Sequence, residues 1–82
     1  MESLLTVINP IFSTKQWKMY KKENTVCYRN QKDEFKIALL PRTAEYEITI
    51  PLHEVLYINK FYKLDMAADY MKMHLHYYQS QN

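Results

Sequence analysis

The chain has 82 residues, with no glycine, eight tyrosines and one cysteine, and its formal net charge is +2 at pH 7. The absence of glycine excludes phosphate-binding loops, dinucleotide fingerprints and nucleophile elbows, because each of these motifs needs the backbone freedom that glycine supplies. A single cysteine permits neither an intramolecular disulfide nor a thiolate metal cage, and the small net charge argues against a dedicated duplex-DNA binder.

The N-terminal third of the chain predicts short extended segments. The apolar run at residues 4–8, which Pro10 ends, predicts an edge strand or a first turn. Residues 16–22 and 25–30 predict two strands of a hairpin around a polar turn at Glu23 and Asn24. Asparagine tolerates the left-handed conformation, so we expect Asn24 to make this turn without glycine.

Residues 34–40 and 45–50 each alternate between apolar and polar side chains, which is the period of a strand with one buried face. Pro41 ends the first of these two segments. The side chains that the alternation places on the buried face are Phe35, Ile37, Leu39, Tyr46, Ile48 and Ile50.

Two helices are expected in the C-terminal part. Residues 52–64 have no clean period, and we interpret them as a helix that follows Pro51. Residues 66–79 predict a second helix with Asp65 at its start. Together these elements predict an α+β fold over residues 1–82: an antiparallel sheet of four or five strands with one or two C-terminal helices packed on one face. This single domain is strand-rich over 4–50 and helical over 53–79.

The final helix carries more apolar surface than one contact needs. Its apolar side chains span an arc of roughly 160°, whereas packing on a sheet needs only about 100°. Either segment 52–64 covers the excess, or a second copy of the chain or another protein does. The side chains that would form such an interface are Tyr70, Met71, Met73, His74, Tyr77 and Tyr78.

The N-terminal hairpin offers a different kind of surface. Alternation places Trp17, Met19, Val26 and Tyr28 on its core face, and Lys18, Tyr20, Lys22, Cys27 and Arg29 on the opposite face. Cations interleaved with an aromatic ring are typical of sheets that bind single-stranded nucleic acid. The same pattern also occurs on any solvated sheet face, and Glu34, Glu45 and Glu47 are expected on that face, where they would oppose a polyanion.

Catalytic and metal-binding patterns are weak. His74 and His76 point about 200° apart on a helix and cannot share an ion. His53-Glu54 lacks the second histidine of a zincin helix. Cys27 has basic neighbours that could lower its pKa, although a lone strand cysteine is more often a packed hydrophobe. We expect no catalytic residue, metal site or cofactor.

Sequence therefore favours a small non-catalytic regulatory or inhibitory binding protein that acts through its Met/Tyr-rich C-terminal helix. Its partners would be a second copy, a host or a cellular protein. The alternatives are a single-stranded nucleic-acid binder and a metal-independent ribonuclease toxin that uses the histidines and the basic hairpin. No apolar run approaches the roughly 20 residues of a membrane span, so a cytoplasmic protein is expected. Residue usage is typical of a low-GC genome, which fits phages of low-GC bacteria and several other viruses, and also many cellular hosts.

Overall fold

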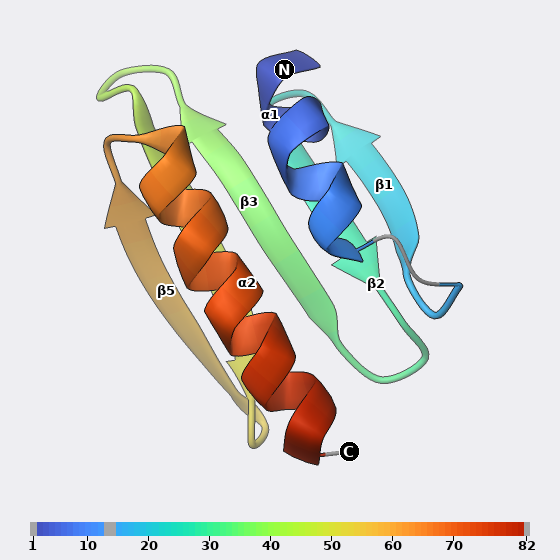
Figure 1. The fold of residues 1–82 in the computed structure, drawn as a ribbon. Coiled ribbons are helices and arrows are strands. Elements are labelled where there is room, and N and C mark those ends of the chain that lie inside the picture. The colour runs from blue at the N-terminus through green and yellow to red at the C-terminus, as the bar shows by residue number, and fades with distance from the viewer. Residues whose placement is uncertain (1, 13–14, 82) are drawn as a thin grey trace.

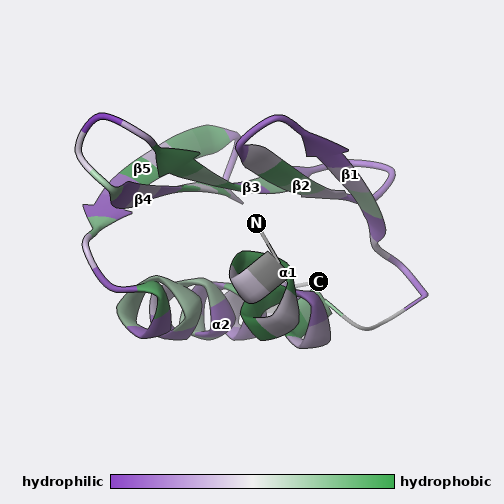
Figure 2. Cartoon of the chain, turned by 90° about the horizontal axis from the view of Figure 1, so that it is seen from above, coloured by the Kyte–Doolittle hydropathy of each residue, from purple (hydrophilic) through white to green (hydrophobic). Residues whose placement is uncertain are grey.

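The computed structural model describes residues 2–12 and 15–81. Five strands form one antiparallel sheet in the order β1-β2-β3-β4-β5, and two helices lie on one side of it (Figures 1 and 2). The elements are α1 (Glu2–Ile8), a 3-10 turn η1 (Asn9–Phe12), β1 (Lys18–Lys22), β2 (Thr25–Arg29), β3 (Glu34–Leu40), β4 (Glu45–Leu52), β5 (Val55–Phe61) and α2 (Leu64–Gln81). This confirms the expected α+β fold. The sheet face that no described helix covers is called the open face below.

Two of the hairpin turns use two residues each, without glycine. Glu23 and Asn24 join β1 to β2, and it is Glu23, with φ of 53°, that takes the left-handed conformation. The expectation for Asn24 was therefore wrong, because the turns that fit a two-residue hairpin loop, types I′ and II′, both need a positive φ at the first loop residue. His53 and Glu54 join β4 to β5 with φ of 52° and 66°, which is the type I′ geometry.

Two expected elements differ from the structure. The run at residues 4–8 belongs to α1 rather than to a strand, because Leu4 and Ile8, one helical turn apart, are both buried in the core. Segment 52–64 is not a helix, since β5 occupies Val55–Phe61 and pairs with β4 along its whole length. Pro51 does not end β4. It lies beyond Thr49, the last β4 residue paired with β3, so its missing N–H costs no bond to that strand.

The core lies between the covered sheet face and the two helices. Phe35 and Ile37 from β3 and Ile48 and Ile50 from β4 are buried, as their alternation predicted. Phe12 of η1 stacks on Tyr28 with ring centroids 4.2 Å apart, and the Tyr28 hydroxyl donates a 2.8 Å hydrogen bond to Asn9 Oδ1. The stacking and the hydrogen bond hold the N-terminal segment against β2.

Helix α2 confirms the expected C-terminal helix and begins two residues before the expected range, at Leu64. Its N-terminal end carries Asp65, whose carboxylate accepts a 2.9 Å hydrogen bond from the Met66 N–H. The helix lies over β4 and β5 (Figure 1). Within the described residues, no helix is both long enough and apolar enough to cross a membrane.

Candidate interaction surfaces

Strand β5 forms one edge of the sheet and is apolar on both of its faces. Register with β4 directs Val55 and Tyr57 toward the helix side, and Leu56 and Ile58 toward the open face. All four remain exposed, with 51%, 47%, 64% and 58% of their surface accessible. In an antiparallel ladder every second residue turns its backbone N–H and C=O away from its neighbour. The free edge of β5 therefore presents hydrogen-bonding groups flanked by apolar side chains.

The opposite edge of the sheet, β1, has a different composition. Its sequence is Lys-Met-Tyr-Lys-Lys over residues 18–22, so charge is spread along the strand. Edge lysines prevent another strand from pairing because their charge would be buried by the new neighbour. Strand β5 has only Lys60 in this role. The difference is visible in Figure 2, where β1 is mostly hydrophilic and β5 largely hydrophobic. Only the β5 edge has the composition of a contact surface.

The flank of α2 next to β5 extends this apolar surface. The Tyr70 ring lies 5.1 Å from the Phe61 ring, and its hydroxyl accepts a 2.7 Å hydrogen bond from Asn59 Nδ2, so this side of α2 faces β5. Met66, Met73 and Tyr77 neighbour Tyr70 on the helix surface at helical spacing and are all exposed. These three residues are called the α2 flank below.

The expected interface residues of α2 are not equivalent in the structure. Met71 is fully buried against the sheet and belongs to the core. Tyr70, His74 and Tyr78 are half-buried, and the first two pack on each other, with ring centroids 4.1 Å apart. Met73 and Tyr77 are exposed. Of the six, these two remain available to a partner without rearrangement, and sequence reasoning missed both Met66 and the whole of β5.

A hollow of about 970 Å3 lies at the other side of the sheet, where β1 begins and β2 ends. Among the described residues, its lining contains four cations, namely Lys15, Lys18, Arg29 and Lys32, and no carboxylate. Tyr20 and Tyr78 contribute aromatic rings. We call it the basic hollow. The structure thus brings together Lys18, Tyr20 and Arg29 of the expected nucleic-acid surface, but it leaves Lys22 at the far end of β1, opposite Thr25.

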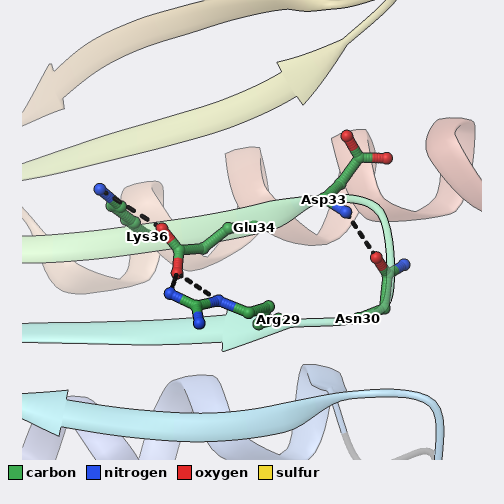
Figure 3. Close-up of polar contacts among 5 residues, drawn as sticks. All are labelled: Arg29, Asn30, Asp33, Glu34 and Lys36. Atoms are coloured by element: carbon green, nitrogen blue, oxygen red, sulfur yellow. Dashed lines mark hydrogen bonds and ion pairs between the residues drawn. The ribbon is translucent and has the colours of Figure 1, made fainter.

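Arg29 is the most constrained cation of the basic hollow. Its guanidinium carbon lies 5.1 Å from the centroid of the Tyr20 ring, and its Nη2 and Nε donate to Glu34 Oε2 at 2.6 and 2.9 Å (Figure 3). Lys36 Nζ approaches the other Glu34 oxygen at 3.4 Å. Burial alone would raise the pKa of Glu34, but the hydrogen bonds from Arg29 and Lys36 outweigh it and lower that pKa. One negative charge therefore offsets part of the positive charge beside the hollow.

The loop between β2 and β3 is ordered by its own side chains. Asn30 Oδ1 accepts hydrogen bonds from the backbone N–H groups of Lys32 and Asp33 at 2.8 and 2.6 Å (the latter in Figure 3). Asn30 Nδ2 donates to the Tyr78 hydroxyl at 3.2 Å, and that hydroxyl donates to the Asp33 carboxylate. The loop that carries Lys32 is therefore fixed to the C-terminal end of α2.

The expected acids are also found on the open face. Register aligns Glu34 with Arg29, and it aligns Glu47 with Lys60, so the cations of β1 and β2 and the acids of β3 and β4 share that face. Positive charge therefore gathers toward β1, and negative charge toward the middle of the sheet. A polyanion has access to one end of the open face rather than to all of it.

The groups considered for chemistry lie apart from one another. His53 is in the β4–β5 turn, whereas His74 and His76 are on α2, and none of them lines the basic hollow. Burial raises the pKa of Cys27, and Glu34 raises it further, against the opposing effects of Lys36 and Arg29. The expectation that its basic neighbours could activate this thiol is thereby corrected. Across the part of the chain that the structure describes, no three His, Cys, Asp or Glu side chains are grouped as metal ligands would be.

Comparison of the chain with models of protein families, with curated proteins and with solved structures found no match. Two surfaces of the described residues are candidates for a function: the apolar one at β5 and α2, and the basic one at β1 and β2.

Proposed function

We propose that this chain is a non-catalytic protein-binding module that works as a homodimer, joined through the β5 edge and the α2 flank. The observation that carries the proposal is the exposure of apolar side chains on both faces of an unpaired edge strand. Such an edge readily accepts another strand, because main-chain hydrogen bonds and side-chain contacts are gained together.

A second copy fits this edge in one register better than in its neighbours. Two β5 strands related by a two-fold axis at Tyr57 would place Leu56 opposite Ile58 of the partner copy. The same register would bring Lys60 beside Glu54 of the partner copy at the hairpin turn. A shift of the axis to Ile58 would instead set Lys60 against Leu56. The Tyr57-centred register matches charge with opposite charge and apolar side chains with apolar ones.

The same arrangement would also cover the α2 flank. Neighbouring strands lie about 4.8 Å apart, and α2 contacts β4 more than β5, so the two α2 helices would lie roughly 10–14 Å from each other across the axis. That separation is at or above the 8–10 Å of packed helices, so the long side chains of Met66, Met73 and Tyr77 would fill the space between them. The product would be one ten-stranded sheet with both α2 helices on the same face.

The wider role that we propose is regulatory or inhibitory binding in the cytoplasm, in a phage- or virus-encoded protein. A lone cysteine suits a reducing compartment, because it has no disulfide partner within the chain. The ribonuclease alternative has less support, because none of the histidines that it requires lines the basic hollow.

Sedimentation velocity tests the dimer. Wild type is expected to sediment as a dimer, and Ile58→Lys as a monomer, because the new lysine would be buried opposite Leu56 of the partner copy. Met19→Lys is the matched control, since it adds the same charge to an exposed position on the other edge and should leave the dimer intact. A monomeric wild type at every soluble concentration would contradict the proposal.

Cross-linking tests the register. In a Cys27→Ser background, Tyr57→Cys should form an intermolecular disulfide, because residues directly opposite in an antiparallel pair lie within disulfide reach. Asn59→Cys should not, since it would face Val55 of the partner copy. A dimer that cross-links at neither position would retain self-association but reject pairing through β5.

A further inference from the structure

The basic hollow is separate from the proposed dimer surface, because β1 and β5 are the two opposite edges of the sheet. Its residues come from three parts of the chain: the segment before β1 together with the first residues of β1, the end of β2 with the loop that follows, and the last turns of α2. The dimer would leave one such hollow at each end of the joined sheet. Any ligand of the hollow is therefore independent of the proposed function.

Charge restricts the class of ligand to anions. The four cations of the hollow point to an anionic group with several charges. Arg29 is partly neutralised by Glu34, which leaves Lys15, Lys18 and Lys32 as the lining cations that form no ion pair with a carboxylate of the described residues. The acids in the middle of the open face limit the anion to this end of the sheet. A short flexible polyanion fits better than a rigid duplex, which would extend over those acids.

Aromatic and amide groups add a second requirement. Tyr20 is exposed, and the Arg29 guanidinium lies beside its ring. Nucleobases stack both on aromatic rings and on guanidinium planes. Gln16, Gln31 and Gln79 also line the hollow and supply donors and acceptors of the kind that bind base edges. A ligand made only of phosphates would leave these groups unused.

The hollow is also held in shape before any ligand arrives. Asn30 closes the β2–β3 loop through the backbone of Lys32 and Asp33, and Tyr78 ties that loop to α2. The Arg29–Glu34 ion pair fixes the direction of the guanidinium. A preorganised site loses less conformational entropy when it binds, which favours binding of a flexible strand.

We propose that the basic hollow binds a short single-stranded polynucleotide, with its phosphates on Lys15, Lys18 and Lys32 and a base stacked on Tyr20 and Arg29. Single strands fit this geometry because their bases are free to turn onto an aromatic side chain, whereas duplex bases are stacked on one another.

Fluorescence anisotropy with a labelled oligouridylate of about twelve nucleotides tests the proposal, since single-strand sites span roughly 4–16 nucleotides. Three phosphate contacts predict that affinity falls by roughly 20-fold between about 50 and 200 mM salt. Lys18→Glu should weaken binding and flatten this salt dependence, and Tyr20→Leu should weaken binding by roughly tenfold while keeping an apolar side chain on the strand. Arg42→Glu is the matched charge control, because Arg42 lies in the turn at the other end of β3.

Four results would overturn the proposal. The first is no salt-sensitive binding by wild type. The second is an equal loss for Lys18→Glu and Arg42→Glu, which would show a general charge effect. The third is binding that Tyr20→Leu leaves unchanged and that polyphosphate displaces as well as the oligonucleotide does, which would show a phosphate surface without base contact. Parallel titrations with the deoxy strand and with a duplex identify the form that is preferred, and a duplex bound more tightly than either single strand would also overturn the proposal. Circular dichroism of each variant confirms that it is folded.

Discussion

Replacement of Ala44 by glycine is expected to stabilise this protein, against the usual effect of an alanine-to-glycine change. Ala44 ends the four-residue loop between β3 and β4 with φ of 58°, and its N–H donates a 2.8 Å hydrogen bond to the Leu40 carbonyl, which holds it there. An L-residue in this left-handed conformation costs about 1–2 kcal/mol, because its Cβ crowds the following carbonyl. The side chain is exposed, so removing the methyl group loses little packing.

Glycine also stabilises the unfolded state, because its backbone has more conformational freedom there. This effect lowers the free energy of unfolding by about 0.4–1 kcal/mol and offsets part of the relieved strain. The net change in the free energy of unfolding is therefore roughly +0.5 to +1 kcal/mol. For a domain of this size it corresponds to a rise in Tm of about 3–6 °C.

Urea denaturation at a fixed protein concentration measures this change, with concentration held constant because self-association would shift the midpoint. Thr43→Gly is the matched control. It lies in the same exposed loop, but its φ is not positive, so it should lower the free energy of unfolding by about 0.4–1 kcal/mol. If Ala44→Gly destabilises the protein as much as Thr43→Gly does, the argument from backbone strain is wrong.

Two further predictions concern the contact between Phe12 and Tyr28. Burial raises the pKa of Tyr28 to about 12, so the folded state keeps a proton that the unfolded state releases near pH 10. The stabilisation that protonated Tyr28 supplies is therefore fully present below about pH 10. The free energy of unfolding falls by roughly 2–3 kcal/mol as the pH rises from there to 12. Comparing urea midpoints of wild type and Tyr28→Phe across that range checks this, and equal declines would contradict it. Phe12→Ala should cost about 3–5 kcal/mol, because Phe12 is buried among Trp17, Tyr28 and Phe35. A loss below about 1 kcal/mol at matched pH would show that η1 contributes little to the core.

Sequence predicted the elements whose pattern reflects burial on one side. β3 and β4 alternate because one face meets the helices, and α2 shows a helical stripe because one face meets the sheet. β5 could not be found in this way. Its residues 55–58 are apolar on both faces and exposed on both, so they have no period of two. A run that is apolar on both faces also fits a buried strand or a helix, so the missing alternation did not identify an edge strand.

The two candidate surfaces differ in how far sequence could anticipate them. The face shared by Lys18, Tyr20 and Arg29 followed from the hairpin turn and the strand period alone. The remainder of the basic hollow did not, because Lys32 reaches it through the order of the β2–β3 loop and Tyr78 reaches it through the packing of α2. Contacts between residues far apart in sequence leave no local pattern. The sequence also did not show that Met71 is buried and Met73 exposed, because it does not say which side of α2 faces the sheet.

The order of the strands has a consequence for how this molecule folds. Each strand pairs only with the strands next to it in the chain, through loops of two to four residues. Closing such short loops costs little chain entropy, and sheets built from local pairs form quickly. The bond between Tyr78 and Asp33, by contrast, joins residues 45 positions apart. We infer that the sheet assembles hairpin by hairpin and that this long-range bond forms when α2 packs on it.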